Sequence, residues 1–208
     1  LSLISEAKDQ LSKLKAEYGT SQAAAVQEIG ELIEQKENQI LKKEEKPAEE
    51  YFDLEIENKN AGGEQLALSD SNLAILDRKN AAAYLFDIDK KALTTLQLPE
   101  AKEAISVTDD KGKVFVLLPK KGIYQTDEGK SKKVIGNDTV WGNVQQIINY
   151  NSNLYLLDTN QGQIFKYLVA ENGYGSASAY FKEGQEIDLE GVNSMAIDGS
   201  VYLAFNKE

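Results

Sequence analysis

The stretch NLYLLDTNQGQIFKY, Asn153–Tyr167, decides the fold because the chain carries a second version of it. NLAILDRKNAAAYLF, Asn72–Phe86, repeats the apolar run, the aspartate, the polar turn and the aromatic residues that follow. In both versions, short apolar runs are bounded by Asp, Asn and other turn-forming residues, which is typical of two β-strands joined by a tight turn. A supersecondary unit that occurs twice predicts a repeat protein.

The second strand of this unit recurs at a near-constant interval. It is anchored at Leu73, Val114, Leu154 and Val201, which are 41, 40 and 47 residues apart. Repeats of about 40 to 50 residues built from short antiparallel strands are typical of β-propeller blades. Long helical patterns are absent after Tyr51, which argues against parallel βαβ units. The predicted fold class is mainly β, with four-stranded antiparallel propeller blades after an α-helical hairpin.

Three complete blades are predicted, with partial blades at both ends. Their strands are expected at 65–69, 72–77, 82–87 and 92–98; at 104–108, 114–118, 122–126 and 132–135; and at 146–150, 154–158, 163–169 and within 177–181. The segment YFDLEIE, Tyr51–Glu57, is expected to add a strand before the first blade, and the last residues supply two strands of a fourth. Closed propellers need about four to eight blades. We therefore expect an incomplete propeller, in which more blades follow Glu208 or open edges pair with another copy.

Residues 1–46 are predicted to form an antiparallel helical hairpin or coiled coil. Mostly apolar residues fall at helical steps of three and four. The first row is Ile4, Ala7, Leu11, Leu14 and Tyr18; after Gly19–Ser21, the second row is Val26, Ile29, Ile33, Lys36 and Ile40, in which Lys36 is the charged exception. The rows are expected to pack on each other, with a partner helix or a second copy as the alternative. Residues 47–50 are expected to be a linker, and 51–208 the propeller.

The composition argues against several classes of function. The formal net charge of −11 repels phosphate backbones and anionic lipid, so nucleic acid is not an expected partner. The chain has no Cys and no His, and so lacks thiolate chemistry, the commonest zinc ligand and the usual general base. No apolar run approaches the roughly 20 residues that span a bilayer, so direct membrane insertion is not expected. The first residue is Leu1, which suggests part of a longer polypeptide.

The run LDTNQGQIFKY resembles the core of NHL-type repeats and of bacterial lactonase-like propeller repeats, which carry D-x-x-x-G before an apolar strand. Asp158, Gly162 and Ile164 match this pattern, and Asp77 matches in the first blade, where Ala81 replaces the glycine. The arginine of NHL repeats is absent from both blades. A helical pair before such a propeller also resembles the C-terminal part of membrane-anchored phosphatase-like bacterial proteins. That resemblance implies an extracytoplasmic location, with the cytoplasm as the alternative.

Candidate binding residues come from the loops at one end of the predicted propeller. Loops between the second and third strands, and connections between blades, open on the same face, and here they gather basic, aromatic and amide side chains. Such residues are typical anchors for a protein or peptide partner. The candidates are Arg78, Lys79, Lys120, Lys121, Trp141 and Asn160. For Trp141, packing between the second and third blades is the alternative.

Asp77 and Asp158 end equivalent strands, and we expect each carboxylate to accept backbone N–H groups of the following turn. The alternative is metal or ligand contact around a central channel. Asp158–Gly162 begins like a calcium loop, D-x-N-x-G, but Val169 stands where the bidentate Glu is required. No catalytic residue, metal site or cofactor is therefore expected.

The leading functional hypothesis is a non-catalytic interaction module that binds a protein or peptide through its loop face. One alternative is a sensor or ligand-binding domain of a larger membrane-tethered signalling protein. Another is a carboxylate-dependent hydrolase that uses Asp77 or Asp158. Self-association through the helices or through open blade edges is a further option.

Overall fold

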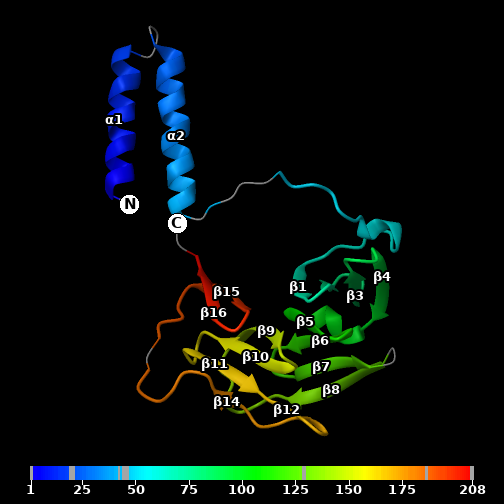
Figure 1. Cartoon of the computed structure of the whole chain (residues 1–208). Coiled ribbons are helices and arrows are strands. Elements are labelled where there is room, and N and C mark those ends of the chain that lie inside the picture. Colours follow the sequence, from blue (N-terminus) through cyan, green and yellow to red (C-terminus); the bar gives the residue numbers. More distant parts are fainter. Residues whose placement is uncertain are drawn as a thin grey trace. The chain divides into compact units, whose positions relative to one another are not determined.

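The computed structural model describes residues 2–18, 22–41, 43, 47–127, 130–185 and 187–206 (Figure 1). The chain divides into two compact units, Leu1–Phe52 and Asp53–Glu208. We call them the helical unit and the propeller unit. The predicted break at Gly19–Ser21, the end of the predicted hairpin at residues 44–46 and residue 1 lie outside the described residues.

The helical unit consists of α1, Ser2–Tyr18, and α2, Ala23–Leu41, which run antiparallel beside each other (Figure 1). Lys8 Nζ and Glu37 Oε2 form an ion pair at 2.6 Å between the helices. Neither helix is long and apolar enough to cross a membrane. The predicted helical period is confirmed.

The side of α2 that is less exposed differs from the predicted row. It runs through Val26, Gly30, Ile33 and Glu37, and Val26 is the one fully buried residue among the described residues of the two helices. A Cβ atom added at Gly30 would lie 3.4 Å from Leu11 Cδ2, so the glycine lets the helices approach closely. The predicted Ile29, Lys36 and Ile40 are exposed instead.

The propeller unit contains three four-stranded antiparallel sheets in chain order, which we number as blades 1 to 3. Blade 1 contains β1 Gln65–Ser69, β2 Asn72–Asp77, β3 Ala82–Asp87 and β4 Ala92–Gln97; blade 2 contains β5 Ser106–Asp110, β6 Lys113–Leu118, β7 Gly122–Asp127 and β8 Lys130–Gly136; blade 3 contains β9 Val144–Tyr150, β10 Asn153–Asp158, β11 Gln163–Tyr167 and β14 Ser178–Ala179. The predicted strands are confirmed, with most ends within two residues. A small hairpin of β12 Val169–Ala170 and β13 Gly173–Tyr174 accounts for extra length in blade 3.

Blade 4 is a two-stranded sheet of β15, Val192–Ile197, and β16, Val201–Phe205. The first strands of the four blades lie innermost, with β1 next to β5, β5 next to β9 and β9 next to β15. The turns that follow these strands line one hollow of about 600 Å³, so the blades surround a common axis (Figure 1). No sheet among the described residues closes the ring, which makes the unit an incomplete propeller.

Apolar cores lie between successive blades. In β6, Val114, Val116 and Leu118 belong to the core shared with blade 1, whereas Phe115 and Leu117 belong to the core shared with blade 3. A third core joins blades 3 and 4. A middle strand that is buried on both faces has no polar face, which explains why KVFVLL and NLYLLD are continuous apolar runs and not alternating ones.

Side chains also satisfy backbone groups across the blade boundaries. Three of them do so along the innermost strands: Ser106 and Thr108 of β5 accept the N–H groups of Ile147 and Asn149 of β9 at 3.1 and 3.0 Å, and Gln146 of β9 accepts that of Met195 of β15 at 2.6 Å. These amides lie on strand edges that have no neighbouring strand. The bonds therefore fix the blades to one another and satisfy groups that an edge would leave unpaired.

The strand predicted for Tyr51–Glu57 is wrong. Leu54–Ile56 form a 3₁₀ helix, η1, because the Asp53 side chain accepts the backbone N–H of Glu55 at 2.9 Å and turns the chain. A short polar side chain that bonds to nearby backbone competes with strand formation. The alternating apolar pattern of this segment gave no sign of that local bond.

Residues 53–63 instead cover the outer face of blade 1. Gly63 lies so close to this face that an added Cβ would be 2.8 Å from Ile75 Cγ2 and 3.9 Å from Leu54 Cδ1. Tyr84 and Phe86, whose side chains point to the same face of the blade, are also buried. The segment thus caps the end of the array, as terminal elements do in repeat proteins.

Gly122 at the start of β7 provides a test of the blade geometry. Its φ is +117°, and a Cβ atom there would lie 2.1 Å from the carbonyl oxygen of Ile135. We expect Gly122→Ala to lower the free energy of unfolding by about 3 kcal/mol or more, because both the backbone conformation and the contact are unfavourable. Its strand partner Gly136 has open space, so Gly136→Ala should change it by less than about 1 kcal/mol. Equal effects in urea titrations would contradict this packing.

Candidate functional site

The loop face is the end of the propeller unit where the β2–β3, β6–β7 and β10–β11 turns meet the segments that lead into β1, β5 and β9. The turns are residues 78–81, 119–121 and 159–162, and the lead-in segments are 58–64, 98–105 and 137–143. By the antiparallel order of the strands, all six predicted binding residues lie in these turns and segments. The prediction that they serve binding stays a prediction.

Asp158 joins the blade 3 turn to the lead-in segment of the same blade. Its Oδ2 accepts the N–H of Gly142 at 2.6 Å, and its Oδ1 accepts those of Asn143 and Gln161 at 2.9 and 3.1 Å. The bond from Gln161 is the predicted turn bond and is confirmed. The two bonds from the lead-in segment were not foreseen, because they link residues that are 15 and 16 positions apart.

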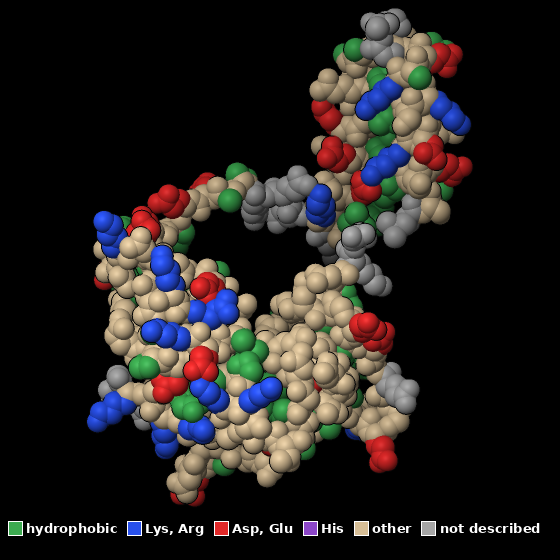
Figure 2. Space-filling view, turned by 180° about the vertical axis from the view of Figure 1, so that it is seen from behind, with side chains coloured by type: hydrophobic (Ala, Val, Ile, Leu, Met, Phe, Trp, Pro, Cys, Tyr) green, Lys and Arg blue, Asp and Glu red, His purple; other side chains and the backbone are tan. Residues whose placement is uncertain are grey.

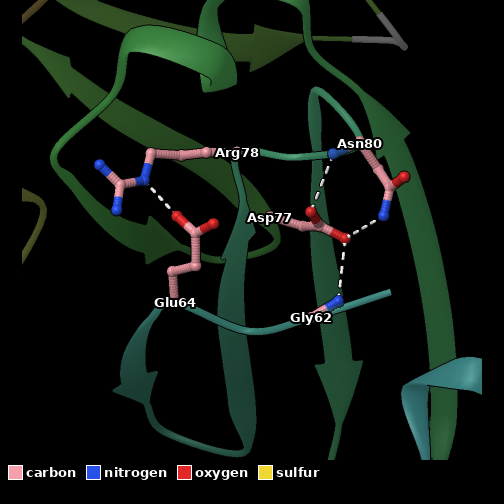
Figure 3. Close-up of polar contacts among 5 residues, drawn as sticks. All are labelled: Gly62, Glu64, Asp77, Arg78 and Asn80. Carbon is pink, nitrogen blue, oxygen red and sulfur yellow. Dashed lines mark hydrogen bonds and ion pairs between the residues drawn. The ribbon is translucent and has the colours of Figure 1, made fainter. Parts of the chain in front are cut away.

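Asp77 has the same role in blade 1 (Figure 3). Its carboxylate accepts the N–H of Gly62 at 3.1 Å and both the N–H and the side-chain amide of Asn80, at 2.9 and 2.7 Å. Tyr84 Oη donates a further bond at 3.2 Å. Burial raises the pKa of Asp77, but the bonds from Asn80, Gly62 and Tyr84 outweigh burial and hold the pKa below its ordinary value.

Blade 2 replaces the aspartate with Leu118, and its lead-in segment differs accordingly. This segment forms the 3₁₀ helix η2, Pro99–Glu103, in which Ala101 and Ala104 donate backbone bonds to Leu98 and Ala101 at 2.8 and 3.2 Å. Its amides therefore need no carboxylate. Leu118 packs with Leu98 and both alanines in the core between blades 1 and 2. Blade 2, which lacks the aspartate, is thus the blade whose lead-in segment makes its own backbone hydrogen bonds.

The cations of the loop face lie over blades 1 and 2. Arg78 pairs with Glu64 (Figure 3), and Lys121 Nζ lies 2.6 Å from Glu103 Oε2. Lys79 and Lys120 are exposed, and Lys120 has a positive φ of 61°. Two of the four predicted cations are therefore already partnered by glutamates, which lowers the net positive charge of the face.

Trp141 packs at the boundary between blades 2 and 3. Its ring contacts the core of these blades and meets Tyr167 edge-on at 6.3 Å. Its indole N–H donates to Tyr167 Oη at 2.7 Å, and Tyr167 Oη donates to Asp138 Oδ2 at 2.9 Å. Burial, and then the bond to Asp138, raise the pKa of Tyr167 above its ordinary value. These contacts agree with the alternative role given to Trp141, which is packing between blades 2 and 3.

Asn160 lines a hollow of about 660 Å³ between blades 3 and 4, which adjoins a second hollow of about 710 Å³. The two hollows share Gln161, Gly162, Ile187 and Asp188. The walls are mixed. Amide and acidic side chains, including Gln145, Gln163, Gln185, Glu190 and Asn206, lie beside apolar ones such as Phe181, Ile187 and Leu189. Sequence reasoning missed this site because much of its wall comes from the connection between blades 3 and 4, which carries no motif.

A third hollow, the axial hollow of about 600 Å³, lies at the opposite end of the propeller unit. Asp70, Asp110, Lys111 and Asp198 lie in its wall. Asp110 accepts a bond from Ser152 Oγ at 3.2 Å. Within the described part of the chain, no group of three or more His, Cys, Asp or Glu side chains is placed to hold a metal ion.

Asp109 of β5 is fully buried between blades 1 and 2, and neither carboxylate oxygen has a hydrogen-bond partner among the described residues. Burial raises the pKa of Asp109 to about 6; the nearby Gly112 amide opposes this rise, whereas the charges of Asp110 and Asp70 add to it. An unpaired buried carboxyl group favours its neutral form.

For Asp77, we expect Asp77→Ala to lower the free energy of unfolding by about 2 to 3 kcal/mol, because backbone and side-chain donors lose a buried acceptor. Its folded pKa lies below the ordinary value of 3.8, so its ionised form contributes stability above pH 4 that is lost as the pH falls further. The exposed Asp89, in the β3–β4 turn, provides the control Asp89→Ala, which should cost less than about 0.5 kcal/mol. Urea titrations from pH 2.5 to 7 measure both, and equal losses would rule out this role.

Asp109 should make the stability depend on pH in the direction opposite to that of Asp77. Its folded pKa of about 6 exceeds the ordinary 3.8, so the folded state binds the proton more tightly and stability falls as the pH rises from about 4 to 6. We expect Asp109→Asn to remove this slope and to raise the free energy of unfolding at pH 7 by about 2 kcal/mol, allowing for an unpaired Asn amide. Thermal unfolding across this range checks it. A mutant that keeps the slope would contradict the assignment.

No protein-family model matches the chain, and no curated protein matches it. Among solved structures it is similar to the computationally designed Ika4 protein, with 11% identity, a TM-score of 0.45, and coverage of 76% of this chain and 99% of that one. It is also similar to a catalytically inactive virginiamycin B lyase from Staphylococcus aureus, with 16% identity, a TM-score of 0.45 and coverage of 71% and 50%. For Myxococcus xanthus glutaminyl cyclase the values are 15%, 0.40, 70% and 62%. The chain thus spans half of the lyase, and the likeness concerns the propeller-like fold alone.

Proposed function

We propose that the propeller unit is a non-catalytic interaction module that binds a protein or peptide across its loop face. The observation that carries the proposal is the pair of adjoining hollows formed by blade 3, the connection that follows it and the start of blade 4, which open on the same face as the lysines of blades 1 and 2. This face therefore offers a recessed polar surface beside a cationic one. A ligand that fits both has hydrogen-bonding groups along its length and a negative charge at one end.

The walls of the hollows suit an extended peptide. Side-chain amides both donate and accept hydrogen bonds, so Asn160, Gln161 and Gln185 can pair with the N–H and C=O groups of a main chain. Acidic side chains of the same partner would find Lys79 and Lys120 at the other side of the face. These two lysines carry more weight in the proposal than Arg78 and Lys121, which would first have to leave Glu64 and Glu103.

Rigidity of the loops supports binding by this face. Asp77 and Asp158 each hold a turn and a lead-in segment together through several hydrogen bonds. A partner that meets loops already held in one conformation loses less free energy in ordering them. The same bonds occupy both carboxylates, so they give no support to a hydrolase that uses Asp77 or Asp158.

A second proposal is a sensor or ligand-binding domain of a larger membrane-tethered signalling protein. The observation that favours it is a separate compact helical unit directly before the propeller unit. The phosphatase-like resemblance implies the same arrangement, and the NHL-type resemblance suits a protein partner. A sensor of this kind would transmit ligand binding to the helices, so hydrogen exchange in α1 and α2 should change when a ligand binds the loop face.

A peptide selection tests the leading proposal. A random peptide library displayed on phage is selected on the immobilised full chain, and the dissociation constants of selected peptides are measured by calorimetry. We expect Lys79→Glu with Lys120→Glu to raise these constants at least about tenfold, because attraction of an acidic peptide becomes repulsion. Asn160→Ala should weaken binding through the hollow by a few-fold.

The matched control is Lys111→Glu with Lys113→Glu, which makes the same change of charge at the opposite end of the blades. We expect it to change the constants less than about twofold. Selected peptides that bind all the variants equally, or that lose binding only with the control pair, would show that the loop face is not the binding surface.

A further inference from the structure

The helical unit has more exposed apolar surface than two packed helices require. Seven large apolar side chains of α1 and α2 are exposed: Leu3, Leu14, Tyr18, Ile29, Leu32, Ile40 and Leu41. Leu3 is 78% exposed and Leu32 is 52% exposed, although both helices are amphipathic. Helices of this length gain most of their stability from packing of the apolar face. Figure 2 shows such side chains between flanking charges along this unit.

Part of this surface forms one apolar groove of about 420 Å³ between α1 and α2. Leu3 and Ala7 line it from α1, and Ile29 and Leu32 from α2. Lys36 is the one charged residue in its wall among the described residues. The groove is distinct from the side on which Lys8 pairs with Glu37. The groove therefore suits the apolar face of another helix, with the positive charge of Lys36 at one end.

The charges beside this groove are arranged for self-association. Glu28 and Lys36 lie four residues before and four residues after Leu32, so the three residues follow one side of α2. If a second α2 packs antiparallel with the two-fold axis at Leu32, Lys36 of each copy lies opposite Glu28 of the other. A two-fold interface requires each contact to occur twice in this reciprocal way. A parallel pair would instead place Lys36 against Lys36 and Glu28 against Glu28.

We propose that the helical units of two copies of this chain form a four-helix bundle in which the two α2 helices pack antiparallel about Leu32. The apolar groove of each copy receives Leu32 and Ile29 of the other. Lys36 gains a carboxylate partner where it enters the apolar wall, which offsets the cost of removing its charge from water. Antiparallel bundles with such seams are the usual way for short amphipathic helices to complete their cores.

This interface is independent of the loop face. Its surface lies in α1 and α2, whereas the proposed peptide surface lies in the propeller unit. Loss of one can therefore be measured without loss of the other. Dimerisation would also present two loop faces, which would strengthen binding to a partner that carries two copies of the recognised segment.

Sedimentation equilibrium of the full chain tests the proposal. We expect the mass to approach twice 23.0 kDa as the concentration rises. Leu32→Glu should raise the dimer dissociation constant at least about 100-fold, because each dimer loses two buried leucines. The matched control is Leu93→Glu in β4, a half-buried leucine of the propeller unit, which should leave the dimer constant unchanged. Circular dichroism checks that both variants keep their secondary structure.

Charge exchange tests the direction of packing. Glu28→Lys alone and Lys36→Glu alone should each weaken the dimer by about tenfold, because each change sets like charges against one another twice. The double variant restores opposite charges and should return the constant to near the original value. A merely destabilised helix would not be rescued by the second substitution.

Cysteine cross-linking gives a second readout, since the chain has no Cys of its own. Oxidation of a mixture of Glu28→Cys and Lys36→Cys chains should give a disulfide-linked dimer, whereas each variant alone should give little. In the antiparallel pair, two copies of residue 28 lie about 12 Å apart along the axis, beyond disulfide reach. A chain that stays monomeric at all concentrations, a dimer that Leu32→Glu leaves intact, or cross-links within each single variant would overturn the proposal.

Discussion

The propeller unit depends on one constraint, which is that no blade can bury its own faces. The middle strands are apolar on both sides, and in blades 2 and 3 each side is buried by an adjacent blade, as Val114 and Phe115 of β6 illustrate. The stability of the propeller unit therefore depends on the interfaces between neighbouring blades as well as on each blade. Interblade bonds such as Thr108 to the Asn149 amide reinforce those boundaries at the innermost strands. It follows that the outer faces of the first and last blades must be covered in another way or be polar.

The two ends are treated differently. Residues 53–63 cover the outer face of blade 1 at Ile75, and Tyr84 and Phe86 of the same face are also buried. Blade 4 has two strands, and its outer face shows Ala196, Tyr202 and Ala204, all exposed. The first end is closed by a local turn and a glycine contact, and the second is open among the described residues. The outer face of a terminal blade can thus be covered by a short segment of chain instead of a further blade.

Much of the architecture follows from the sequence because blades repeat local rules. Strand ends are set by the Asp and Gly turns, and β2 and β3 lie where the pattern places them. The turn bonds of Asp77 and Asp158 were predictable for the same reason. Contacts between distant segments were not: the bonds from Gly62, Gly142 and Asn143 join parts of the chain that no local pattern relates.

The candidate site shows the same division. The six predicted residues follow from blade topology, which assigns turns to an end of the propeller. Their surroundings do not follow, because Glu64 and Glu103 neutralise Arg78 and Lys121 from neighbouring segments. The hollow beside Asn160 depends on how the connection into blade 4 folds back over the blade 3 turn. The loop residues alone predict a basic and aromatic face, whereas the structure has a mixed face with a polar recess.

The edge of β16 and the groove of the helical unit are two candidate surfaces for self-association, and they place different requirements on the second copy. The open edge of β16 requires a strand in matched register, and its outer face offers one large side chain, Tyr202, among small ones. The groove of the helical unit requires only a helix with apolar residues at helical spacing and a reciprocal charge pair, and α2 itself supplies both. Residues 28, 32 and 36 satisfy the two-fold condition within a single helix. For these reasons we propose the helical unit, and not the edge of β16, as the surface for self-association.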